Sequence, residues 1–164
     1  MSYKDSGIIA LKGIIDEDFC NYKVPSMTLM FPKCSFKCGS DFCQNSNLSN
    51  AKTLSLSIDD LCKRYINNPI TQAVVCQGLD PMDSFIDLVK FIWALRVKYV
   101  CLDDIVIYTG YDKDEIPEEI QELSTLACNI VVKYGRYIPD QKSHYDEVLG
   151  VKLASDNQYA ERTS

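Results

Sequence analysis

The sequence predicts an α/β fold built on a parallel sheet, in the form of an open, partial β/α barrel of about five to six strands. Short apolar runs typical of strands alternate with longer segments typical of helices, and this alternation indicates parallel strands joined by right-handed crossovers. Too few units are present to close a barrel of eight strands. We expect one domain over residues 1–164, with an N-terminal strand or hairpin in residues 1–20 and the barrel core in residues 27–159.

The predicted strands are short, and most of them are continuously apolar, as expected for strands that are buried on both faces. Residues Ile8–Ile15 alternate only weakly and precede an acidic run, which predicts a strand or hairpin before the core. Because the carboxyl ends of parallel strands meet at one edge, the stretches that follow the core strands should form one mouth. The core strands are predicted at Met27–Phe31, Ala73–Cys76, Ile105–Tyr108, Asn129–Val132 and Val148–Leu153.

Three helices are predicted between these strands. Ser57 and Asp60 resemble a capping box that opens a helix over Ile58–Ile66. The segment Asp83–Tyr99 is too long and too evenly apolar for a strand and predicts a largely buried helix. A third helical region runs from Asp112 to about residue 127, with a proline at position 117 suited to a first turn.

Composition and charge exclude several classes of protein. The net charge is −6 and the basic residues are scattered, so the electrostatic footprint of a nucleic-acid-binding protein is missing. No apolar run approaches the roughly 20 residues that span a bilayer, and the N-terminus lacks the apolar core of a secretory signal. We expect a cytoplasmic protein that contacts neither nucleic acid nor membrane.

Three of the eight cysteines lie within ten residues, directly after the first core strand: Cys34, Cys38 and Cys43. In a reducing compartment, clustered thiols more often bind metal or catalyse than form disulfides. Iron–sulfur clusters and structural zinc sites normally take four protein ligands, so three cysteines indicate a metal site with an open position. A zinc site remains an alternative, although zinc ligands usually pair as Cys-x2-Cys and the spacings here are x3 and x4.

The other five cysteines are isolated in the sequence. Cys20 lies upstream of the cluster, and a role as a fourth ligand is an alternative. The remaining four lie in apolar or helical surroundings, where a free cysteine behaves as a small hydrophobic residue. They are Cys62, Cys76, Cys101 and Cys128.

The cysteine loop resembles that of the radical S-adenosylmethionine (radical SAM) enzymes. In that superfamily an aromatic residue precedes the third cysteine, as Phe42 precedes Cys43 here. A four-iron, four-sulfur cluster held by three cysteines then leaves one iron free for the cofactor. The usual spacing is Cys-x3-Cys-x2-Cys, so this loop has two extra residues, placed at about 39–41. The resemblance implies a [4Fe-4S] cluster and S-adenosylmethionine as cofactors, in a radical SAM type of barrel.

Segments after later strands extend the resemblance. Gly78-Leu79-Asp80-Pro81 is similar to the Gly-Gly-Glu-Pro segment whose backbone receives the cofactor's amino group, although such a sequence is also an ordinary turn. Tyr108-Thr109-Gly110-Tyr111 and Asn157-Gln158 are similar to segments of the activating proteins of anaerobic ribonucleotide reductase. One departure is Tyr134-Gly135-Arg136-Tyr137, which stands where well-known members have Asp-Gly-Pro-Phe. The likeness extends over residues 21–158.

The resemblance implies a function and a set of site residues. The activating proteins reductively cleave S-adenosylmethionine to methionine and a 5′-deoxyadenosyl radical, which takes a hydrogen atom from a glycine of the reductase. Phe42 is expected beside the adenine or, alternatively, in the core, and Lys133 beside the methionine carboxylate or, alternatively, in solvent. The expected cofactor-binding residues are Phe42, Gln77, Gly78, Leu79, Asp80, Tyr108, Thr109, Lys133 and Asn157.

The resemblance also implies partners. These are a glycyl-radical enzyme, with the large subunit of anaerobic ribonucleotide reductase expected, and an electron donor such as flavodoxin. Two other functions stay open from the sequence. One is another small radical SAM enzyme that acts on a peptide or metabolite. The other is an iron–sulfur electron carrier or a zinc-binding module, which would more often complete its site with a fourth ligand.

Overall fold

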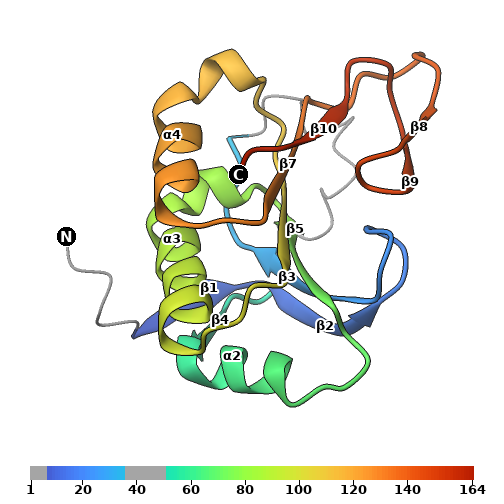
Figure 1. The fold of residues 1–164 in the computed structure, drawn as a ribbon. Helices are drawn as coiled ribbons and strands as arrows, with labels where there is room; N and C mark the ends of the chain where they lie inside the picture. Colours follow the sequence, from blue (N-terminus) through green and yellow to red (C-terminus); the bar gives the residue numbers. More distant parts are fainter. Residues whose placement is uncertain (1–6, 36–50) are drawn as a thin grey trace.

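The computed structural model describes residues 7–35 and 51–164, and within them six strands form a central sheet (Figure 1). The four inner strands are parallel, and one antiparallel strand lies at each edge. In spatial order the strands are β10 (Tyr159–Arg162), β7 (Ile130–Tyr134), β6 (Asp104–Tyr108), β5 (Ala73–Gly78), β3 (Ser26–Phe31) and β2 (Gly13–Asp18).

Three α-helices of the described residues lie on the same side of this sheet in Figure 1: α2 (Ile58–Ile66), α3 (Phe85–Trp93) and α4 (Pro117–Leu126). Each inner strand pairs with the inner strand that precedes it in the chain, so right-handed crossovers place the connecting helices on one face. The fold is mixed α/β with a largely parallel central sheet, as the sequence predicts. None of the helices in residues 7–35 and 51–164 is long and apolar enough to cross a membrane.

Both faces of the inner strands are buried, which explains their continuous apolar runs. On β5, Val74 and Cys76 belong to the large core under the helices, whereas Ala73 and Val75 belong to a second core on the opposite face. The alternation follows from the pleat, which turns successive side chains to opposite faces. The second core is covered by Tyr22, Leu149, Leu153 and Ala160.

The predicted fifth parallel strand, Val148–Leu153, is wrong. Residues Val151–Leu153 form β9, which pairs antiparallel with β8 (His144–Asp146) in a separate two-stranded sheet. A parallel strand would need a crossover of a dozen or more residues, usually helical, and the connection from β7 contains no helix. The turn at Gly150 (φ +72°) instead folds this segment back on itself. The sheet position beside β7 belongs to β10, which the sequence analysis missed.

The N-terminal region forms strands, as predicted, but it does not form a hairpin. β1 (Ile8–Leu11) and β2 do not pair with each other as a hairpin. β1 pairs antiparallel with β4 (Leu54–Ser57), a strand not predicted, whereas β2 pairs with β3 at the edge of the central sheet. Alternation in β1 is weak because Ile9 and Leu11 are buried while the exposed Ile8 is apolar too.

The helix signals are largely confirmed. The Ser57 hydroxyl accepts a hydrogen bond from the Asp60 amide (3.3 Å) at the start of α2, and Pro117 is the first residue of α4 after a short 3₁₀ turn, η3 (Lys113–Glu115). The long predicted helix is divided into three parts. They are a 3₁₀ turn, η1 (Pro81–Ser84), then α3, then a π-helical turn, η2 (Ala94–Lys98).

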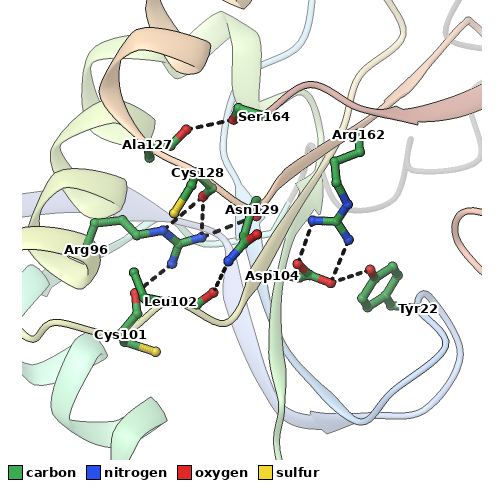
Figure 2. A network of polar contacts seen from close by, with 10 residues as sticks. All are labelled: Tyr22, Arg96, Cys101, Leu102, Asp104, Ala127, Cys128, Asn129, Arg162 and Ser164. Atoms are coloured by element: carbon green, nitrogen blue, oxygen red, sulfur yellow. Dashed lines mark hydrogen bonds and ion pairs between the residues drawn. The ribbon is translucent and has the colours of Figure 1, made fainter.

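Arg96, in η2, joins that turn to the loops before β6 and β7 (Figure 2). Its buried guanidinium donates to the carbonyl oxygens of Cys128 (2.9 and 3.1 Å), Cys101 (2.8 Å) and Asn129 (3.2 Å). Asn129 in turn donates from its side chain to the carbonyl of Leu102 (2.7 Å). The network therefore satisfies backbone groups at the amino ends of the strands.

Candidate functional site

A cavity of about 400 Å³ lies at the carboxyl ends of the parallel strands. Its volume is in the range of small-molecule and cofactor sites. Seven of the residues predicted to bind a cofactor line its wall, together with the first cysteine of the loop, Cys34. The seven are Gln77, Gly78, Leu79, Asp80, Tyr108, Thr109 and Lys133.

Lys133 is the buried cation of this wall. It follows from the register that Lys133 lies beside Tyr108, its partner in the ladder between β6 and β7. Its ammonium donates to the carbonyl oxygens of Gly135 (2.9 Å) and Thr109 (3.5 Å) and lies 5.8 Å from the centre of the Tyr108 ring. Lys133 is 7% exposed, so the alternative of a solvated charge is wrong.

Asp80 is the buried carboxylate of the wall. It accepts hydrogen bonds from the amide of Met82 (3.0 Å), the amide of Gly110 (2.9 Å) and the hydroxyl of Thr109 (3.1 Å). Burial raises the pKa of Asp80 to about 6 against the lowering effect of these bonds. Asp80 thus takes part in an ordinary turn at the start of η1, which was the alternative interpretation of Gly78-Leu79-Asp80-Pro81. It also lines the cavity.

Gly78 is required by the adjacent strand. Its φ is +94°, and a Cβ there would lie 2.7 Å from both Met30 Cα and Phe31 N. Such a contact with backbone cannot be relieved by rotating a side chain. A larger residue at this position therefore disrupts the pairing of β5 with β3, and Gly78→Val is not a selective probe of ligand binding.

The start of the cysteine loop is held against the end of β5. The amide of Leu79 donates to the Phe31 carbonyl (3.1 Å), and the amide of Asp80 donates to the Lys33 carbonyl (2.6 Å). These bonds continue the ladder between β3 and β5 and hold Cys34, which is half-buried, at the cavity.

The remaining predicted ligands, Cys38 and Cys43, and the predicted adenine contact, Phe42, lie outside the described residues. Within residues 7–35 and 51–164 no group of three or more His, Cys, Asp or Glu side chains is arranged to hold a metal ion. Cys34 is the one predicted ligand whose position is described, and its thiol chemistry suits an iron–sulfur cluster.

Cys20 lines the same cavity as Cys34, although the two are far apart in the sequence. The buried Asp18 fixes the turn that carries it, by accepting from the Cys20 amide (2.8 Å), the Asn21 side chain (2.5 Å) and the Thr28 hydroxyl (2.5 Å). Burial acts to raise the pKa of Asp18, but these bonds outweigh it and hold the pKa below its ordinary value. Tyr108 OH also donates to the Asn21 carbonyl (2.5 Å).

Asn157 lies behind the wall, unlike the other described residues predicted to bind the cofactor. Its side-chain amide donates to the Arg136 carbonyl (2.7 Å). The neighbouring Gln158 lines the cavity and donates to the Gly135 carbonyl (3.3 Å). Together they fix the loop after β7, where Gly135 has a φ of +100°.

Arg136 and Gln158 are cavity residues that the sequence analysis did not assign. Arg136 also forms an ion pair with Glu115 (2.8 Å). The departure of Tyr134-Gly135-Arg136-Tyr137 from the related motif was the signal that pointed to this loop.

The other four cysteines lie away from the cavity wall. Cys62 and Cys76 are buried in the large core, and burial raises the pKa of both thiols, to about 12 for Cys62. This confirms their interpretation as small hydrophobic residues. Cys101 is half-buried, and Cys128 is exposed rather than packed in apolar surroundings.

Residues 25–159 match the family model of the 4Fe-4S single cluster domain. The chain belongs to this family. Membership of the 4Fe-4S single cluster domain family supports a [4Fe-4S] cluster as the cofactor and is compatible with a redox enzyme. The matched segment contains Cys34, Cys38 and Cys43 but not Cys20. No match to a curated protein is found.

Proposed function

We propose that the protein is a radical SAM activating enzyme that generates a glycyl radical on a partner, the large subunit of an anaerobic ribonucleotide reductase. We also propose that its sheet is an open, partial barrel of the radical SAM type. The family model that matches the chain is found in radical SAM-type proteins, which supports this assignment.

One observation carries the proposal. The first cysteine of the predicted cluster loop and residues after three successive parallel strands line a single cavity. These residues lie far apart in the sequence, at the ends of separate strands. Parallel topology alone brings such stretches to one edge, but here they also leave a cavity lined by a buried carboxylate and a buried ammonium. The convergence of Cys34, Asp80, Thr109 and Lys133 is what a cofactor beside a cluster requires.

The chain's own residues would bind and orient S-adenosylmethionine. Asp80 supplies a buried negative charge for the amino group, and Lys133 supplies a buried positive charge for the carboxylate. Backbone groups at Gly78 and Leu79 would bind the same methionine end. Opposite charges held in a buried site act more strongly on a ligand than they would in water, so these residues would fix the sulfonium beside Cys34.

When bound, the cluster supplies the single electron that cleaves S-adenosylmethionine to methionine and a 5′-deoxyadenosyl radical, which takes hydrogen from the partner's glycine. An electron donor such as flavodoxin would then reduce the cluster again. The protein's contribution is orientation and the exclusion of competing reactions. The partner would cover the cavity mouth, as lids do in other enzymes.

The decisive experiment is anaerobic reconstitution with iron and sulfide, followed by reduction in the presence of S-adenosylmethionine. Formation of 5′-deoxyadenosine supports the enzyme, and a glycine-centred doublet in electron paramagnetic resonance, located on the reductase, supports the activase. The control pair is Cys34→Ser, which should abolish both signals, and Cys128→Ser, which changes an exposed cysteine outside the cavity wall. Cofactor cleavage without a glycyl radical would favour an enzyme that acts on another peptide or a metabolite.

Cys20 favours a second candidate, an iron–sulfur electron carrier. Its thiol lines the same cavity as Cys34 and would complete the usual set of four cysteine ligands. A carrier would hold a fully coordinated cluster and would not cleave S-adenosylmethionine. Mössbauer spectroscopy separates the two functions, because only an open cluster changes one iron site when S-adenosylmethionine is added.

A further inference from the structure

A second carboxylate, Asp83, joins the cysteine loop to the end of β6. The amide of Ser35, the residue after Cys34, donates to Asp83 Oδ2 (2.8 Å). The hydroxyl of Tyr111 donates to Asp83 Oδ1 (2.5 Å). Each carboxylate oxygen therefore contacts a different loop of the site.

Asp83 belongs to the same turn as Asp80, and the two side chains accept hydrogen bonds from different groups. Asp80 fixes Thr109 and Gly110, whereas Asp83 fixes Tyr111, whose amide in turn donates to the Thr109 hydroxyl (3.1 Å). Among the hydrogen bonds of residues 7–35 and 51–164, only Asp83 of this pair contacts the cysteine loop through its side chain. The turn after β5 therefore couples the loop that carries Cys34 to the loop after β6.

The position of Asp83 would have two electrostatic effects on a cluster bound at Cys34. A negative charge close to the cluster opposes the addition of an electron. In addition, the Ser35 amide that donates to Asp83 is directed to a carboxylate rather than to a cluster sulfur. Cluster potentials depend on nearby charge and on hydrogen bonds to the sulfurs, so both effects would lower the reduction potential.

We infer that Asp83 is a positioning residue that fixes the start of the cysteine loop at Ser35 and lowers the reduction potential of the cluster. The inference rests on the proposed function only in taking Cys34 as a cluster ligand. A low potential suits the proposed reaction, because the reduced cluster must give an electron to a sulfonium.

The test is a redox titration of the reconstituted protein, without S-adenosylmethionine, followed by electron paramagnetic resonance of the reduced cluster. Asp83→Asn keeps an acceptor for the Ser35 amide but removes the charge. We expect it to favour reduction by about tenfold, a shift of about 59 mV for one electron. Asp83→Glu keeps the charge and should retain the low potential, with lower iron content because its longer side chain positions the loop less well.

Two further variants separate charge from structure. Tyr111→Phe removes a hydrogen bond to Asp83 but leaves its charge, so the potential should stay at or below the wild-type value. Glu118→Gln removes a charge from the exposed surface of α4 and should leave the potential unchanged. The inference is overturned if the reduction potential of Asp83→Asn equals that of the wild type. It is also overturned if the potential of Asp83→Glu rises as far as that of Asp83→Asn.

The outcome is distinguishable from failure of the proposed function. A wild-type protein that binds the cluster but does not cleave S-adenosylmethionine would refute the enzyme. The potential of Asp83→Asn would still decide the role of Asp83. If Asp83→Asn does not fold, the other two variants provide the test. The inference would be overturned if Asp83→Glu kept the wild-type potential and iron content while Tyr111→Phe raised the reduction potential.

Discussion

Thr109 Oγ1 donates a hydrogen bond of 3.1 Å to Asp80 Oδ2, and both side chains are at least 95% buried. The bond links the segments that follow two adjacent parallel strands, and both residues line the cavity. It also gives a buried carboxylate one of the donors that its ionised form requires.

We predict that Thr109→Val destabilises the protein by about 1–2 kcal/mol, because it leaves a buried carboxylate with one donor fewer. Thermal unfolding followed by circular dichroism would measure the change. Thr125→Val on α4 is the matched control, since the Thr125 hydroxyl is exposed and bonds only to the Gln121 carbonyl of its own helix among the bonds described. An equal effect of the two substitutions would contradict the importance of the Thr109–Asp80 bond.

Stability should depend on pH through Asp80. The pKa of Asp80 in the folded protein is about 6, above its ordinary value of 3.8, so the folded state binds this proton more tightly than the unfolded chain. The resulting stabilisation is present below about pH 4, declines as the pH rises to about 6 and is absent above it. Melting temperatures of wild type and Asp80→Asn between pH 4 and 8 would show this decline in the wild type alone.

Binding of S-adenosylmethionine should weaken as the pH falls below about 6. The amino group of the ligand favours an ionised Asp80, so a protonated carboxyl must first lose its proton, at a cost of up to about tenfold in affinity per pH unit. Calorimetry between pH 5.5 and 7.5 would measure this dependence. His144→Gln, which removes the single histidine, should retain it, and Asp80→Asn should lose it. A pH-independent affinity in the wild type would place the amino group elsewhere.

We predict that Cys34→Ser, Cys38→Ser and Cys43→Ser each abolish a stable cluster, whereas Cys20→Ala retains it. Iron content and visible absorbance after anaerobic reconstitution would measure this. The prediction follows from the spacing of the three cysteines and from the position of Cys20 outside the family match. Loss of the cluster in a folded Cys20→Ala protein would show a fourth cysteine ligand and favour the carrier.

Gly78→Ala should destabilise the protein by roughly 2 kcal/mol or more, because it combines a positive φ with a backbone clash. Gly13→Ala is the matched control. A Cβ at Gly13 would meet the tip of the Met30 side chain at 2.9 Å, and that tip is free to rotate. Denaturant titration would compare the two variants, and similar stabilities would mean that the β5–β3 pairing tolerates a side chain at residue 78.

The inner sheet and part of the cavity wall could be predicted from the sequence, because both depend on local patterns. Continuous apolar runs fix the buried strands, and the polar stretches after them then reach one edge. The pairing of β10 with β7 could not be predicted in this way. Tyr159–Arg162 is a short, partly exposed run, and its place in the sheet depends on the second core that the residues before it form.

Contacts between segments that are distant in the chain also could not be predicted from the sequence. Cys20 reaches the cavity because Asp18 and Tyr108 hold its turn there, and neither residue carries a spacing that would signal this. Asp83 lies in a segment read as an ordinary helix start, so its contacts with Ser35 and Tyr111 were not foreseen. The position of Asn157 behind the wall likewise depends on how the loop after β7 folds.

The Arg96 network and the cavity lie at opposite ends of the same strands. The contacts that stabilise the fold at the amino ends are therefore separate from the residues that line the cavity. β6 has five residues, so about 13 Å separates its first and last Cα atoms at a rise of roughly 3.3 Å per residue. Substitutions around Arg96 would change the lifetime of the folded chain while leaving the cavity wall in place. Natural variation at the cavity end can then alter specificity without eroding the contacts that hold the amino end together.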